Sequence, residues 1–274
     1  MNFDRQVLRE LLSKSEWKHF KATGELPPNF VYPESETVTV NATDFVNVLC
    51  VRFGNKYGAD YVEKLRNMVS RHLTVPYEFY CLTDDQHPID GVKSIIRPNQ
   101  GYVRGWWHKV HMFDPSLGLK GRILYFDLDV IIHDNINKLA IGHQNKFMGI
   151  RDFNRKFNSD WNMLNSSVLS WPAGLHTDIF TVFQTDPKKA QRMHGDQDWI
   201  WQTAKSRITF WPERWIMSYK WEIRDRSEIA YSGARRHFKT VKEVNIPRDC
   251  SVCVFHGDPN PHDVQDPYVL DNWR

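Results

Sequence analysis

The acidic triplet Asp127-Leu128-Asp129 is the sharpest chemical signal in the sequence, and it lies inside the apolar run Arg122–Ile132. In an extended chain, residues i and i+2 point to the same side, so the two carboxylates would converge while Leu128 points to the core. Two ionised carboxylates held close together repel each other and lose hydration, and a divalent cation relieves both penalties. The triplet therefore predicts a metal site at a strand end, with a surface pair of aspartates as the alternative.

Two further polar motifs could take part in chemistry. Gly195-Asp196-Gln197-Asp198 precedes a helical pattern, so its carboxylates either cap that helix or face a reacting group. His256 follows the apolar run Ser251–Phe255, and Gly257 after it permits close approach of another group. A histidine at such a strand end is either structural or a ligand.

Alternating strand-like and helix-like segments must position these residues. Apolar runs predict strands over Phe45–Phe53, Glu78–Thr83, Gly91–Pro98 and Arg122–Ile132, and helical spacing predicts helices over Ala59–Leu73 and Trp106–Phe113. This alternation predicts a mostly parallel sheet with helices on both faces. Since ligands bind at the carboxyl ends of such strands, the turn Gly54–Gly58, the pair Asp84-Asp85 and the acidic triplet should meet at one edge.

The rest of the chain is less regular. Phe147–Phe153, Asn165–Trp171, Ile208–Glu213 and Ser251–Gly257 resemble strand segments, and Leu175–Phe183 has helical spacing. Near the N-terminus, helical spacing runs from residue 4 to residue 20, and three prolines in Leu26–Pro33 end it. We therefore expect an N-terminal helical extension over residues 1–40 and one main domain over residues 41–274.

Composition excludes several classes of protein. The 274 residues carry 36 Lys and Arg against 33 Asp and Glu, 41% are hydrophobic, and the mean hydropathy is −0.56. This balance argues against disorder and against nucleic-acid binding, and no apolar run approaches the roughly 18–20 residues of a membrane span. The charged N-terminus lacks the features of a signal peptide, which predicts a cytoplasmic protein.

Cysteine usage is ordinary. Cys50 and Cys81 sit in apolar runs and are predicted to be buried thiols. Cys250-x-x-Cys253 lacks the further ligands that a zinc site needs.

The order of the motifs resembles a known family. Ile123–Ile136, ILYFDLDVIIHDNI, is similar to the strand and DxD motif of the family-8 retaining glycosyltransferases. Asn165-Ser166-Ser167-Val168 is similar to the family's N-S-G-V segment, and Gly195–Asp198 to its D-Q-D segment. Phe255-His256-Gly257 with Pro259-Asn260-Pro261 is similar to its C-terminal H-x-x-G-x-x-K-P segment. The resemblance spans roughly residues 45 to 262.

The resemblance implies a GT-A-type, Rossmann-like α/β fold with a mixed, mostly parallel sheet. It implies a hexosyltransferase that moves a sugar from a nucleoside-diphosphate sugar, with UDP as the expected nucleotide, to a saccharide or other hydroxyl acceptor, with retention. A Mn²⁺ or Mg²⁺ ion would be held by Asp127, Asp129 and His256.

Further site residues follow from the same resemblance. Phe53 or Tyr57 would stack on the base, Asp84 would bond the base or ribose, Lys109 would contact the phosphates, Asn165 would bond the donor sugar or the acceptor, Asp196 would bond sugar hydroxyls, and Gln197 or Asp198 would lie near the reacting face of the sugar. For Phe53, Tyr57, Asp84 and Asn165, packing or turn formation is the alternative. The lysine that the family places in its last segment is Asn260 here, which leaves Lys109, Lys56 or His262 to supply that positive charge.

Two other functions compete with glycosyl transfer. A haloacid-dehalogenase-type phosphatase also has an apolar strand ending in DxD, with the first Asp as nucleophile, but Val130-Ile131-Ile132 follows here instead of a small residue and Thr or Val. A carbohydrate-binding relative without turnover is the second alternative, because Asn260 replaces the lysine.

Overall fold

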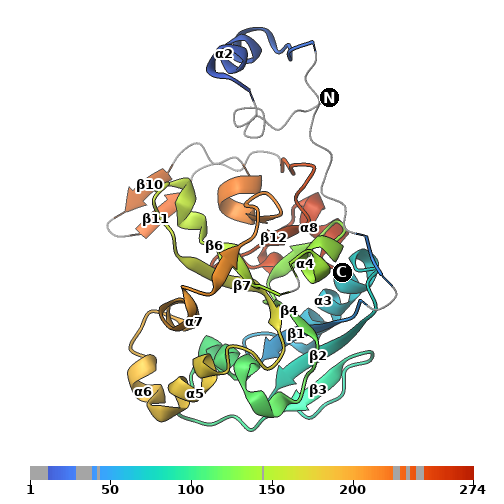
Figure 1. Ribbon diagram of the computed structural model, residues 1–274, viewed down its shortest axis with the longest axis vertical. Coiled ribbons are helices and arrows are strands. Elements are labelled where there is room, and N and C mark those ends of the chain that lie inside the picture. The colour runs from blue at the N-terminus through green and yellow to red at the C-terminus, as the bar shows by residue number, and fades with distance from the viewer. Residues whose placement is uncertain are drawn as a thin grey trace.

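The computed structural model describes residues 12–28, 39–41, 44–143, 145–224, 229–232, 235–238 and 244–274. A seven-stranded sheet in the order β3-β2-β1-β4-β7-β6-β8 organises the chain (Figure 1). Its strands are β1 (Val46–Arg52), β2 (Tyr77–Thr83), β3 (Lys93–Ile96), β4 (Arg122–Phe126), β6 (Phe147–Arg151), β7 (Leu164–Pro172) and β8 (Ile208–Phe210). All of them run in one direction except β7, which is antiparallel to both of its neighbours.

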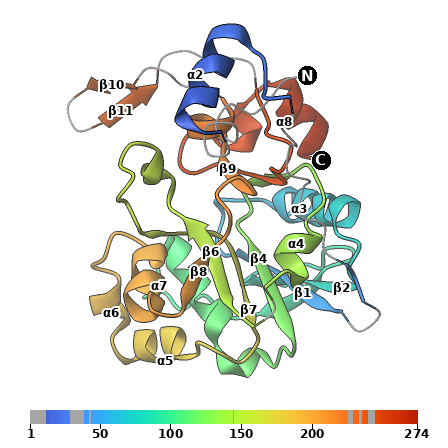
Figure 2. The same cartoon turned by 45° about the horizontal axis from the view of Figure 1, so that its top comes forward.

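Both faces of this sheet are covered, which explains the near-continuous apolar strands. Along β1, Val46 and Val48 belong to one buried cluster, whereas Leu49 belongs to another. The first cluster contains the apolar stripe of α3 (Ala59–His72), and the second is formed with η1 (Gly105–Phe113), α5 (Asp178–Thr185) and α7 (Asp196–Ala204). Figure 2 shows α3 and α4 on one side of the sheet and α5, α6 and α7 on the other. The predicted α/β fold with helices on both faces is confirmed.

A smaller, three-stranded sheet adjoins the first. It has the order β5-β12-β9 and consists of β5 (Val130–Ile132), β12 (Val252–Val254) and β9 (Ile216–Ser218). The remaining elements are α2 (Lys14–Thr23), η2 (Pro115–Leu117), α4 (Asn137–Ile141), η3 (Phe153–Lys156), α6 (Pro187–Ala190), η4 (Tyr219–Ile223), β10 (Ile229–Ser232), β11 (Arg235–Phe238), η5 (Pro261–Asp263) and α8 (Pro267–Asn272).

The prediction of a single strand over Arg122–Ile132 is wrong. The chain leaves the large sheet after Phe126, turns through the acidic triplet, and joins the small sheet at Val130. Backbone partners enforce this break, because Asp127 N–H donates to the Ser167 carbonyl while the Asp129 carbonyl accepts from Phe255 N–H. The triplet therefore lies at the junction of two sheets.

Smaller differences concern helices. Trp106–Phe113 forms most of the 3₁₀ helix η1 instead of an α-helix, and α5 begins three residues later than expected. Near the N-terminus, α2 begins with a capping box between Ser13 and Glu16, while residues 4–11 of the predicted helix lie outside the described residues. The division at residue 40 stays a prediction.

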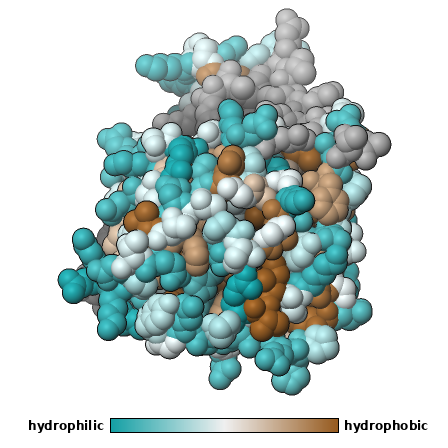
Figure 3. Space-filling view, turned by 60° about the horizontal axis from the view of Figure 1, so that its bottom comes forward, coloured by the Kyte–Doolittle hydropathy of each residue, from teal (hydrophilic) through white to brown (hydrophobic). Residues whose placement is uncertain are grey.

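Burial and surface character agree with the composition. All four cysteines are free and buried, as expected for Cys50 and Cys81. Among the described residues, no helix is both long enough and apolar enough to cross a membrane. Hydrophilic side chains cover most of the face drawn in Figure 3, where hydrophobic ones gather in limited areas.

Candidate active site

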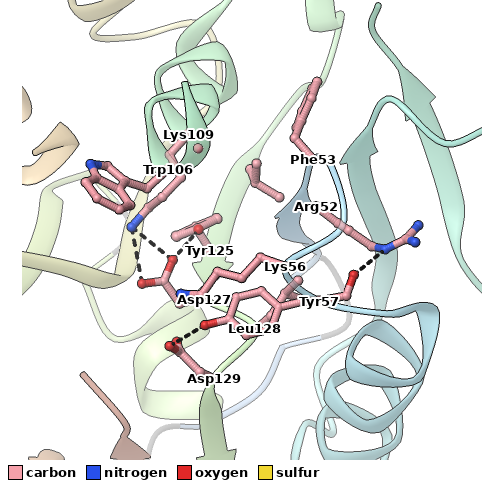
Figure 4. Close-up of a pocket in the computed structure, with 12 residues that line it drawn as sticks. Arg52, Phe53, Lys56, Tyr57, Trp106, Lys109, Tyr125, Asp127, Leu128 and Asp129 are labelled. Atoms are coloured by element: carbon pink, nitrogen blue, oxygen red, sulfur yellow. Dashed lines mark hydrogen bonds and ion pairs between the residues drawn. The ribbon is translucent and has the colours of Figure 1, made fainter. Parts of the chain in front are cut away.

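A pocket of about 250 Å³ opens at the carboxyl ends of β1 and β4, the edge where the sequence predicts ligand binding. Its walls include Phe53, Tyr57, Trp106, Lys109, Asp127 and Asp129 (Figure 4). Five of these six residues were predicted from the sequence, so the fold brings together side chains from the turn after β1, from η1 and from the acidic triplet.

Lys109 is the electrostatic centre of the pocket. Its Nζ lies 2.9 Å from Asp127 Oδ1 and 3.2 Å from Asp196 Oδ2, and it donates to Ser166 Oγ at 2.9 Å. Tyr125 OH also donates to Asp127 Oδ1, at 2.5 Å. Burial alone would lower the pKa of Lys109, but the two carboxylates outweigh it and raise that pKa above its ordinary value. Lys109 is therefore a permanently charged, buried group.

Asp129 has a different environment. Tyr57 OH donates to Asp129 Oδ2 at 2.9 Å. Burial, followed by the charge of Asp127, raises the pKa of Asp129 to about 6, although Tyr57 and Lys56 act in the opposite direction. Burial, followed by the charge of Asp129, raises the pKa of Tyr57, so the Tyr57 hydroxyl stays protonated and donates the hydrogen bond. The pocket thus holds a carboxylate whose ionisation is unfavourable without an added cation.

Aromatic rings line two parts of the pocket wall. Phe53 stacks on His108 with ring centroids 4.0 Å apart and an interplanar angle of 2°. The Trp106 side chain is 58% exposed and makes no ring contact with another described residue, whereas Trp107 beside it is buried. Trp106 is therefore available to a ligand, while Phe53 already has a partner on one side.

His256, the predicted third metal ligand, follows Phe255, whose N–H donates to the Asp129 carbonyl. Its Nε2 is 2.7 Å from Ser218 Oγ, and its ring stacks on Phe153 at 5.0 Å and meets the edge of Trp221 at 4.4 Å. Within the described part of the chain, no group of three or more His, Cys, Asp and Glu side chains could hold a metal ion. The imidazole thus has a hydrogen bond and ring contacts within the protein, and its role as the third metal ligand stays a prediction.

Replacing His256 by Ala should lower stability and leave nucleotide binding unchanged. Loss of the Ser218 hydrogen bond and of the ring contacts should cost about 1–3 kcal/mol, which lowers the melting temperature by roughly 3–10 °C. Calorimetry and nucleotide titration of the same variant check both parts. The exposed His194→Ala is the stability control. A His256→Ala protein of normal melting temperature but weakened metal dependence would support the ligand role.

Asp84 and Asn165 serve the backbone. The Asp84 carboxylate accepts from Gly54 N–H at 3.1 Å, and φ of +65° at Gly54 is a conformation that favours glycine. Asn165 is buried in β7, where its Oδ1 accepts from Ser167 N–H at 3.1 Å. Neither residue lines the pocket. Asp84 makes the contact expected of a turn residue, and Asn165 makes the contact expected of a buried strand residue.

The Asp196-Gln197-Asp198 segment opens α7, but no side chain caps that helix: its N-cap is Gly195. Asp196 is buried and points to Lys109 and to Ser166 Oγ, which donates to it at 2.9 Å. The capping interpretation is therefore wrong for Asp196. Gln197 and Asp198 are half-buried in the first turn, and neither side chain hydrogen-bonds to another described residue.

Four site residues were missed or left without a role. Tyr125 could have been found, because it lies two residues before Asp127 on the same strand and shares its side. Ser166 is distinguished from its sequence neighbours by its contacts with Lys109 and Asp196, which its own segment does not predict. Arg52 and Trp106 carried no signal, since their positions at the pocket depend on how the strand ends are placed in the fold.

Comparisons with known proteins give weak likenesses only. No family model and no curated protein matches the chain. The galactosyltransferase LgtC, solved with donor and acceptor sugar analogues, shares 13% identity over 78% of this chain and 88% of its own, with a TM-score of 0.49. The glycosyltransferase GlyE of Streptococcus pneumoniae TIGR4 shares 16% identity over 62% of this chain and 46% of its own, with a TM-score of 0.46.

The bifunctional glycosyltransferase WbbM shares 12% identity over 86% of this chain and 52% of its own, with a TM-score of 0.48. The chain thus matches about half the length of GlyE and of WbbM. All three TM-scores lie below 0.5.

Proposed function

We propose that the chain is a GT-A-type glycosyltransferase that uses a nucleoside-diphosphate sugar, with UDP as the nucleotide. The observation that carries the proposal is the pocket at the β1 and β4 ends, where two carboxylates, a buried lysine and exposed aromatic surface adjoin. Aromatic rings suit a base or a sugar face, and the charged groups suit a diphosphate. The order of the sequence motifs supports the same reaction.

A divalent ion fits the acidic pair on charge grounds. Asp127 and Asp129 line the pocket, and their charges would repel a diphosphate. Of the three cations that line it, Arg52 and Lys109 are already ion-paired, Arg52 with Asp85 and Lys109 with Asp127 and Asp196.

The donor groups also suit such an ion. No described residue donates a hydrogen bond to Asp129 Oδ1, so this oxygen is available to a ligand. Mg²⁺ commonly binds through one or two carboxylates together with substrate phosphates, which requires no histidine. Asp127 and Asp129 would hold Mn²⁺ or Mg²⁺, which when bound would act as a Lewis acid toward the departing diphosphate.

The chain's own residues would position the donor. Lys109 fixes Asp127 and Asp196 relative to each other, and Tyr57 orients the Asp129 carboxylate through its hydroxyl. Preorganised charges of this kind lower the barrier without rearrangement during the reaction. Gln197 and Asp198, one and two residues beyond Asp196, are the proposed groups at the reacting face of the sugar, and transfer with retention remains part of the proposal.

UDP should stabilise the protein strongly only when a divalent ion is present. A ligand at 100 times its dissociation constant adds about 2.7 kcal/mol, which for a chain of this size raises the melting temperature by roughly 5–10 °C. Thermal denaturation with UDP and Mn²⁺, compared with UDP and excess EDTA, measures the difference.

Two results would contradict the proposal. One is equal stabilisation by UDP in Mn²⁺ and in EDTA, which would remove the role of the acidic pair. The other is release of phosphate from p-nitrophenyl phosphate without hydrolysis or transfer from any nucleotide sugar, which would favour the phosphatase alternative.

A further inference from the structure

Three cationic side chains line the pocket, and two of them are already neutralised. Arg52 donates to Asp85 Oδ2 at 2.8 Å and to the Tyr57 carbonyl at 3.0 Å. Lys109 is buried between Asp127 and Asp196. Lys109 cannot turn to an incoming anion without leaving the buried Asp196 unpaired, which is costly. Arg52 is held by two partners, Asp85 and the Tyr57 carbonyl.

Lys56 differs from both. It is exposed on the turn after β1, and its Nζ lies 4.6 Å from the centroid of the Tyr57 ring. Among the described residues it has no hydrogen-bond or ion-pair partner. Figure 4 shows its side chain reaching into the pocket between Tyr57 and Asp127. Its charge also lowers the pKa of Asp129, but no carboxylate is hydrogen-bonded to it or ion-paired with it among the described residues, so Lys56 can meet a ligand.

The other candidates for this role are occupied or neutral. His262 contacts Tyr61 OH and lies 3.2 Å from Asp263. Asn260 is uncharged, and its Oδ1 accepts from Tyr57 OH at 3.4 Å. Tyr57 thus contacts both Asn260 and Lys56. Beside Tyr57, the positive charge therefore comes from Lys56, on the turn after β1, and not from Asn260 in the C-terminal segment.

We propose that Lys56 is the phosphate-binding cation of the pocket and contacts the diphosphate of the donor. This inference rests on the proposed function, because a nucleoside diphosphate is the ligand that function requires. The turn holds the backbone of the lysine in place. Gly54, at φ +65°, donates its N–H to the Asp84 carboxylate, and Arg52 donates to the Tyr57 carbonyl. Lys56 therefore starts from a fixed backbone with only its flexible side chain to move.

The test compares Lys56→Gln, Lys56→Arg and the control Lys120→Gln by calorimetric titration in Mn²⁺ with UDP, uridine and inorganic diphosphate. Lys120 is also exposed, but it precedes β4 at the opposite edge of the sheet. For Lys56→Gln we expect the dissociation constant of UDP to rise about 10-fold or more, since a charge-assisted hydrogen bond is lost. Uridine, which has no phosphate, should bind as to the wild type.

The charge-conserving and control variants sharpen the expectation. Lys56→Arg should keep most of the UDP affinity, and Lys120→Gln should keep all of it. The affinity of the wild type for UDP should fall with added salt more steeply than that of Lys56→Gln, because one ionic contact is missing in the variant.

The outcomes separate this inference from the proposed function. Unchanged UDP affinity in Lys56→Gln overturns the role of Lys56 and leaves the glycosyltransferase proposal standing. Lys56-dependent binding of inorganic diphosphate without any nucleotide binding supports Lys56 and sinks the nucleotide-sugar donor. A wild type that binds neither UDP nor inorganic diphosphate overturns both.

Discussion

Asp129→Asn is expected to lower activity about 100-fold or more while making the protein more stable at neutral pH. The carboxylate is ionised at pH 7 in a place where burial and Asp127 raise its pKa from 3.8 to about 6. This rise corresponds to about 3 kcal/mol as an upper limit, and we expect a gain of about 1–3 kcal/mol when the charge is removed. The amide oxygen of asparagine can still accept the Tyr57 hydrogen bond.

The sign of this effect depends on pH. A carboxyl group whose pKa is higher in the folded state than in the unfolded state favours folding when protonated, and that contribution is lost as pH rises through 6. The advantage of Asp129→Asn over the wild type should therefore be full above pH 7 and should vanish toward pH 4. Denaturant unfolding at pH 4, 5.5 and 7.5 measures it, with the exposed Asp271→Asn as control.

Activity should change in the opposite direction. Loss of one of the two carboxylates proposed to hold a metal should lower the transfer rate about 100-fold or more, which is about 2.7 kcal/mol or more of transition-state stabilisation. A variant that keeps its activity, or one that is less stable than the wild type at pH 7.5, would contradict this description of Asp129.

Lys109→Met should be the most destabilising single change in the pocket. It leaves Asp127 and Asp196 without the cation that lies between them and pairs with both, and Asp196 is 5% exposed. Breaking a buried ion pair by removing one partner costs about 3–5 kcal/mol, so the melting temperature should fall by roughly 6–20 °C. Lys120→Met on the surface should have little effect.

A double-mutant cycle distinguishes charge from packing. If the loss comes from an unpaired carboxylate, adding Asp196→Asn to Lys109→Met should recover part of the stability, because the amide needs no counter-ion. Unfolding free energies of the two single variants and the double variant give the coupling. Additive losses would mean that Lys109 acts through its aliphatic stem and not through its charge.

Local pattern was enough to predict much of the fold. The runs around β1 and the apolar stripe of α3 were found within one or two residues, since both depend on side chains close in sequence. The break between β4 and β5 was not found, because the backbone partners that cause it, Ser167 and Phe255, lie far along the chain.

The site residues likewise divide into those that the sequence predicts and those that depend on contacts between distant segments. Asp127 was predicted from its own segment and Lys109 from the family resemblance, and the fold places them in contact. The surroundings of His256 were not predictable, since Ser218 and Trp221 come from a segment without a recognisable motif. Which lysine is paired and which is free depends on distances that only the folded chain defines.

The position of the acidic triplet has a mechanical consequence. Asp127 follows the last residue of β4 in the large sheet, and Asp129 precedes the first residue of β5 in the small one. A ligand that binds both carboxylates therefore links the large sheet to the small one. A tilt of one sheet against the other would change the spacing of the two carboxylates. Ligand affinity at this pocket would therefore depend on how the two sheets are aligned. A substitution on β9 or β12 that shifts the small sheet would change that affinity without touching the ligand.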